Sequence, residues 1–158
     1  MNKVSVRKII LNDYAAFLLT VAGPIMLAIS GFTAVFGFIP RFRLRGGQAV
    51  GPEAATIAFV IAVVLTLLLL FLLARRISRI SRILASGPRT RAKVLNIAFF
   101  KDRGRMEFEY PHDGEIQTTG TAIMKNKHTT AIGVGDEIEI AIDRSDPSRA
   151  LVVGLYCN

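Results

Sequence analysis

The chain has 158 residues, of which 51% are hydrophobic, and its formal net charge is +8. This length excludes two separate large cores, and a single cysteine, Cys157, excludes an intramolecular disulfide. Residues 1–93 hold 13 Lys or Arg and 2 acids (net +11), whereas residues 94–158 hold 7 Lys or Arg and 10 acids (net −3), so the basic character belongs to the first part of the chain.

Two long stretches in this first part carry no charged residue. The first follows a basic N-terminus, residues 1–13, which we expect in the cytoplasm, and runs over residues 14–39. As a helix it measures about 39 Å at 1.5 Å per residue, which exceeds a hydrocarbon core of about 30 Å. The apolar part of a cleaved secretory signal is only about 7–15 residues long, so we interpret this stretch as an uncleaved first transmembrane helix.

The second uncharged stretch, residues 54–74, gives about 31 Å of helix and matches the bilayer core. Residues 40–53 form the loop between the two predicted spans. Ten Lys or Arg flank the spans on the side of the chain ends, and only Arg41, Arg43 and Arg45 lie in the loop. Because Lys and Arg concentrate on the cytoplasmic side, we expect a multi-pass membrane protein with both termini in the cytoplasm and a short external loop.

Small residues recur along the first predicted span at a 4-3 spacing, which keeps one helix face toward a partner. In lipid, small side chains let helix backbones approach closely. The predicted helix-packing seam consists of Ala16, Thr20, Gly23, Ser30, Ala34 and Gly37, with Leu27 as the one large residue, and is matched by Ala55, Ala58, Ala62 and Thr66 in the second span. Two interpretations stay open: the seam closes the hairpin on itself, or it docks onto a neighbouring membrane subunit.

The residues after the second span predict that its helix continues as a basic amphipathic extension, residues 75–87. Ile77, Ile80 and Leu84 share one face, and Gly87-Pro88 is a stop signal. Four arginines of this extension are predicted to contact anionic lipid headgroups: Arg75, Arg76, Arg79 and Arg82. The alternative interpretation is that these arginines only fix the orientation of the span.

From residue 91 the apolar pattern changes to a period of two, which is typical of β-strands with one buried face. Residues 105–110 alternate with Met106, Phe108 and Tyr110 inward, and residues 137–143 place three isoleucines inward. Further strands are predicted at 92–100, 115–124 and 150–156, separated by turn residues such as Asp113-Gly114. The predicted fold is therefore membrane α+β: a two-helix transmembrane hairpin followed, in residues 91–158, by a small five-stranded antiparallel β-barrel of the OB or SH3 kind.

The end of this β domain resembles a known family. The residues that carry the likeness are Val134-Gly135-Asp136 with the strand that follows, and Asp146-Pro147 with Ala150-Leu151. They resemble the ending of bacterial two-helix membrane proteins with a C-terminal β domain, the family of the domain of unknown function 3592. Ala92-x-Val94 and Phe108-x-Tyr110 also fit, over about residues 55–155, whereas Ile142 and Arg144 stand where Tyr and Pro are usual. The resemblance implies this architecture and a location in the bacterial inner (cell) membrane, and it supplies no reaction and no catalytic residues.

No catalytic, cofactor-binding or metal-binding constellation is recognisable in the sequence. The histidines, His112 and His128, lack Cys or carboxylate neighbours at metal-ligand spacing. The β domain is net −3 and its aromatic residues mostly alternate inward, which argues against nucleic-acid binding. We therefore expect a non-enzymatic accessory or assembly subunit that associates with other membrane proteins and with anionic lipids. The alternative is a membrane-anchored regulatory or sensor module that binds anionic lipid or a small ligand.

Overall fold

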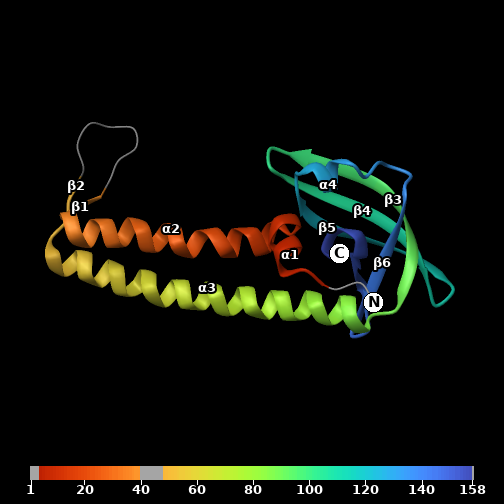
Figure 1. Ribbon diagram of the computed structural model, residues 1–158, viewed down its shortest axis with the longest axis horizontal. Helices are drawn as coiled ribbons and strands as arrows, with labels where there is room; N and C mark the ends of the chain where they lie inside the picture. Colours follow the sequence, from red (N-terminus) through yellow and green to blue (C-terminus); the bar gives the residue numbers. More distant parts are fainter. Residues whose placement is uncertain (1–3, 40–47, 158) are drawn as a thin grey trace. The chain divides into compact units, whose positions relative to one another are not determined.

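The chain divides into two units, and both of its ends belong to the same one. A computed structural model describes residues 4–39 and 48–157 (Figure 1). One unit, here called the β module, combines Met1–Phe17 with Arg75–Asn158, and the other, here called the helical hairpin, is Leu18–Ala74. The β module is therefore larger than the predicted 91–158 domain, because it includes the segments that precede the first predicted span and follow the second.

Two long helices form the helical hairpin: α2 (Tyr14–Phe36) and α3 (Pro52–Ser86). Both are long and apolar enough to cross a membrane, and only 17% of the most apolar stretch of each is buried. Val35, Leu67 and Phe71 are among the large apolar side chains that they expose. A core helix of a soluble protein would bury such side chains, so this surface suits lipid better than water.

The two helices end close to, but not at, the predicted limits of the spans. α2 ends at Phe36, before Gly37, which has a left-handed φ of +71°. The two-residue strands β1 (Phe38–Ile39) and β2 (Gln48–Ala49) then pair antiparallel. Pro52 opens α3, a position where its missing N–H costs no hydrogen bond. The second helix thus begins two residues before the predicted span, and the arginines of the predicted loop, Arg41, Arg43 and Arg45, lie outside the described residues.

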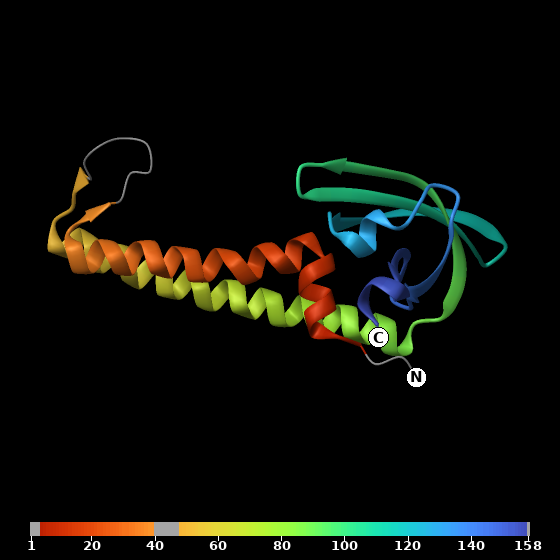
Figure 2. The same cartoon turned by 45° about the horizontal axis from the view of Figure 1, so that its top comes forward.

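The β module contains a nearly closed antiparallel sheet of five strands, which confirms the predicted number of strands and their antiparallel arrangement. The strands are β3 (Arg89–Phe100), β4 (Arg103–His112), β5 (Glu115–Met124), β6 (Glu137–Asp143) and β7 (Asp146–Val152), in the order β5-β4-β3-β6-β7. Its outer strands approach each other, since the Thr119 hydroxyl donates to the Ser148 carbonyl at 2.7 Å. Figure 2 shows the sheet curling around the C-terminal segment.

The predicted alternation is confirmed in β4, where Met106, Phe108 and Tyr110 are at most 1% exposed. The β4–β5 turn is the tight hairpin typical of Asp-Gly, since Asp113 and Gly114 both have positive φ. In β6 the alternation breaks, because Ala141 is buried together with its neighbours Ile140 and Ile142. Both faces of this end of β6 are covered, because the segment after α3 and the C-terminal helix lie against it.

Three short helices of the β module are not predicted by the sequence: α1 (Val6–Asn12), α4 (Lys127–Thr130) and α5 (Val153–Tyr156). The predicted strand at 150–156 is wrong beyond Val152, because the chain turns there into α5, which packs against α1. The N-terminal segment, predicted only as a basic tail, is a folded part of the β module, with Ile9 fully buried and Asn12 2% exposed.

The predicted helical extension after the second span is confirmed, because α3 continues without a break to Ser86. Ile80, Ile83 and Leu84 are at most 7% exposed. Ile80 and Ile83 face the open side of the sheet, between β5 and β7. Burying one such side chain stabilises a fold by about 1.5–3 kcal/mol, so the extension is part of the core of the β module.

Candidate functional site

The two helices of the hairpin meet along part of the predicted seam. Gly23 is buried, and its carbonyl accepts a hydrogen bond from the Thr66 hydroxyl at 3.4 Å. The seam residues that are at most 7% exposed are Ala16, Ala55, Ala62 and Thr66. Those of intermediate exposure are Thr20, Ser30 and Gly37. Small residues therefore line the contact between α2 and α3 around Gly23.

Ala34 and Ala58, the other two predicted seam residues, are exposed. Thr33, only 5% exposed, takes the buried position next to Ala34. Regular helix geometry would keep Ala34 near the face of Gly23, since eleven residues make about three full turns, so the burial of Thr33 shows that the contact does not follow the 4-3 spacing to the end of α2. The sequence left two uses of the seam open, and the structure separates the residues: Gly23 closes the hairpin, and Ala34 and Ala58 stay on its surface.

The candidate functional site is the place where both long helices join the β module, and it centres on an ion pair. Asp13 lies between α1 and α2, and its side chain is 2% exposed. Arg76 Nε and one terminal nitrogen donate to the two carboxylate oxygens of Asp13, each at 2.8 Å. The Ala16 N–H also donates to Asp13 Oδ1, at 2.7 Å, which caps the start of α2. One buried carboxylate thus joins the first turn of α2 to α3, and its hydrogen bonds raise the pKa of Arg76.

The N-terminal segment is held between the C-terminus and the end of β5. Three backbone carbonyls near the C-terminus accept its donors: Tyr156 from the Ser5 N–H at 3.0 Å, Cys157 from Lys8 Nζ at 2.5 Å, and Leu155 from the Asn12 side chain. On the other side, Asp13 forms a β-bridge with Ile123 of β5. Burial raises the pKa values of Tyr156 and Cys157, so both side chains stay protonated in this packed end of the chain.

A cavity of about 290 Å³ opens beside the Asp13–Arg76 pair, between α3, β5 and β7. Three arginines line it, and each faces a carboxylate. Arg76 binds Asp13, Arg149 binds Asp146 at 2.8 Å, and Arg79 lies 3.8 Å from Asp143. The positive charge of the cavity is therefore balanced from within the β module, which suits a structural joint better than an anion-binding site.

The four arginines predicted to contact lipid headgroups differ in their surroundings. Arg75 and Arg82 are exposed on α3. Arg76 binds Asp13, and the half-exposed Arg79 points toward Asp143. Among the described residues, no carboxylate lies within salt-bridge distance of Arg75 or Arg82. These two arginines are therefore the ones whose charges remain available to lipid headgroups.

Acid should weaken this joint through Asp143. The Ser145 hydroxyl and N–H donate to its carboxylate at 2.6 and 2.9 Å, and these bonds, followed by the charges of Arg79 and Arg82, lower its pKa. The resulting stabilisation is present above the unfolded pKa of about 3.9 and is lost as the pH falls through the lower folded value. We expect Asp143→Asn to flatten the acid side of the stability curve of the detergent-solubilised chain, measured as thermal unfolding between about pH 7 and pH 3. Asp113→Asn, at an exposed turn, is the control and should leave that side unchanged; equal curves for both variants would contradict the role of Asp143.

Among the residues that the structure describes, no group of three or more His, Cys, Asp or Glu is placed to hold a metal ion. The exposed glutamates of β6 face arginines of β3, with Glu139 3.1 Å from Arg89 and Glu137 3.4 Å from Arg91. No family model, curated protein or solved structure matches this chain. The resemblance to the domain of unknown function 3592 therefore rests on its strand and turn residues and stays a prediction.

Proposed function

We propose that this protein is a non-enzymatic accessory or assembly subunit of a larger membrane complex, in which the helical hairpin anchors the β module at the cytoplasmic face of the inner membrane. One observation carries the proposal: both segments that flank the predicted spans belong to the core of the β module. Ile9 precedes the first span and is fully buried, and Ile80 follows the second and is 4% exposed. Two segments that lead from the spans into the packed core tie the β module to its anchor at two points of the chain, which suits a module that keeps a partner at the membrane.

The distribution of charge and the path of the sheet support the finer parts of this proposal. Lys and Arg are concentrated near the chain ends, which favours the cytoplasm for the β module. The outer strands β5 and β7 approach each other across the remaining gap, which favours a small, partly open barrel of the OB or SH3 kind.

The surface of the helical hairpin supports a partner within the membrane. Ala34 and Ala58 are small and exposed, which favours the second interpretation of the seam, docking onto a neighbouring membrane subunit. In lipid, a small side chain on a helix surface allows a second helix to approach and gain dispersion contacts. We expect a transmembrane helix of another subunit to use this surface.

Purification from native membranes tests the function. We expect the full chain, cross-linked in the membrane and isolated in mild detergent, to retain a defined set of membrane proteins by mass spectrometry. Ala34→Leu combined with Ala58→Leu should reduce this set strongly, because leucine keeps a neighbouring helix at a distance. Ala28→Leu is the matched control, since Ala28 is also exposed but lies on another side of α2. A solubilised chain that runs as a lone monomer without specific partners would contradict the proposal.

A further inference from the structure

Two phenylalanines and three basic side chains gather at the end of the β3–β4 hairpin. We call this group the basic tip: Phe99, Phe100, Lys101, Arg103 and Lys125. Phe100 is 62% exposed, and Lys101 Nζ and Arg103 Cζ lie 5.6 and 5.7 Å from the centre of its ring. Lys125 Nζ lies 5.9 Å from the ring centre of Phe99. The tip therefore presents an exposed aromatic ring flanked by cations, with Asp102 the one acid in the turn.

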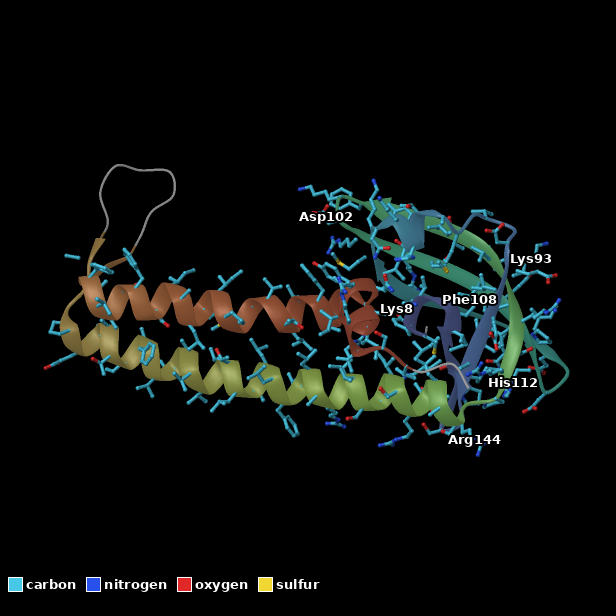
Figure 3. All side chains as sticks on the ribbon, viewed as in Figure 1. Lys8, Lys93, Asp102, Phe108, His112 and Arg144 are labelled. Carbon is cyan, nitrogen blue, oxygen red and sulfur yellow. The ribbon has the colours of Figure 1, made fainter. Side chains whose placement is uncertain are left out.

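The charge of the sheet is polarised along β4. The basic tip occupies one end of this strand, and the β4–β5 turn at the other end carries Asp113 and Glu115. The ten residues of β4 separate the two ends by about 30 Å. Figure 3 shows Asp102 and His112 at opposite ends of the sheet. The net charge of −3 of residues 94–158 hides this asymmetry, so the sequence average gives no sign of a basic surface.

The basic tip lies at the end of the β module from which α2 departs. Asp13, the residue before α2, forms its β-bridge with Ile123, which pairs with Gly104 next to the hairpin turn. Asn126, next to Lys125, donates to the Leu11 carbonyl at 3.1 Å. The Lys125 N–H in turn donates to the Asp102 carbonyl at 2.9 Å. Contacts within the β module thus connect the tip to the residues at which the first candidate span begins.

We propose that the basic tip is a second lipid contact of this protein, which binds the headgroups of anionic phospholipids in the membrane that holds the helical hairpin. Aromatic rings favour the membrane–water interface, and Lys and Arg near it are attracted to the phosphates of anionic lipids. A bilayer fits better than a nucleic acid, because the tip is tied to the start of a span. The proposal rests on the membrane anchoring proposed above, and it adds a surface on the sheet that is separate from the arginines of α3.

Depth-sensitive fluorescence in lipid nanodiscs tests the proposal on the full chain. An environment-sensitive fluorophore is attached to Asp102→Cys at the tip, Ile116→Cys at the opposite end, or Ile61→Cys in α3, each with Cys157→Ala. Ile116 and Ile61 are 74% and 53% exposed. In nanodiscs that contain phosphatidylglycerol and a quencher in the lipid headgroup region, we expect quenching at Asp102→Cys and none at Ile116→Cys. A quencher in the acyl chains should act on Ile61→Cys whether or not the tip binds lipid.

Charge reversal separates lipid binding from mere proximity. A triple variant should reduce quenching at position 102 to the level seen at position 116: Lys101→Glu, Arg103→Glu and Lys125→Glu. Nanodiscs that contain only phosphatidylcholine should have the same effect on the parent tip. Arg144→Glu, at the β6–β7 turn, is the matched control and should have no effect. If Ile61→Cys is quenched but Asp102→Cys is not, the basic tip is not a lipid contact while the anchoring holds. If Ile61→Cys is not quenched either, the membrane anchoring fails, and this proposal fails with it.

Discussion

Arg76→Met should loosen the N-terminal segment from the C-terminal end of the chain within the β module. The substitution leaves Asp13, whose side chain is 2% exposed, without its positive partner. Removing one member of a buried ion pair costs about 3–5 kcal/mol, but Arg76 is 40% exposed and water reaches the pair, so we expect about 2–3 kcal/mol. The thiol of Cys157 reports the opening, because Cys157 is 5% exposed and its backbone forms an isolated β-bridge with Val4 of the N-terminal segment. Its labelling rate in the solubilised full chain should rise by about 30- to 150-fold.

Two further variants identify the ion pair as the cause. Arg75→Met removes a neighbouring charge that is exposed and should leave the labelling rate nearly unchanged. Asp13→Asn combined with Arg76→Met removes both charges and keeps a side-chain oxygen to cap α2, so the double variant should label more slowly than Arg76→Met alone. If the double variant labels as fast as Arg76→Met or faster, the effect comes from lost packing of the arginine stem and not from an uncompensated carboxylate.

Local patterns in the sequence predicted most of the elements. Length and the absence of charge predicted α2 and α3, and the period-two pattern predicted β4 and β6. These signals depend only on residues close together in the sequence, because the spacing of apolar residues shows which face of a helix or strand is buried. The apolar face of residues 75–87 and the Gly87-Pro88 stop signal predicted the extension of α3 for the same reason. The last strand went wrong beyond Val152. Val153-Gly154-Leu155-Tyr156 holds only one β-branched residue, so its preference for a strand is weak, and packing against the distant α1 decides for a helical turn.

The junction could not be predicted because its partners are distant in sequence. Asp13 and Arg76 are 63 positions apart, and the residues around each of them do not predict a contact between the two. A signal existed nevertheless: Asp13 is the one acid in residues 1–52, it stands at the start of an apolar stretch, and a basic cluster follows the second stretch. Ser5 gave a similar hint as a helix cap, since its side chain accepts a hydrogen bond from the Lys8 N–H. Net charge obscured the basic tip in the same way, because averaging over the domain cancels its two ends.

Gly23→Ala should separate α2 from α3 in the helical hairpin, and Gly23→Leu should do so more strongly. A Cβ at Gly23 would lie 2.9 Å from Thr66 Cγ2, closer than carbon atoms approach in proteins. Overpacking of this kind costs about 1–3 kcal/mol, and in lipid it also removes the backbone approach on which association depends. Spin labels at Ile29 and Ile61, both exposed, should show a longer and broader distance distribution in the variants, measured by pulsed electron resonance in nanodiscs with Cys157→Ala.

Rescue at Thr66 decides whether this contact is the cause. Thr66→Ala removes the Cγ2 atom that the new Cβ would strike, so Gly23→Ala combined with Thr66→Ala should recover the distance distribution of the parent chain. Thr66→Ala alone also loses the hydrogen bond to the Gly23 carbonyl, but that bond is long, at 3.4 Å, and the same hydroxyl donates to the Ala62 carbonyl at 2.7 Å, so the loss should be small. Gly31→Ala is the matched control, because its Cβ would lie 3.7 Å from the Phe59 ring, an ordinary contact. A Gly23→Ala chain that keeps the parent distances without the second change would show that α2 and α3 do not depend on close approach at this point.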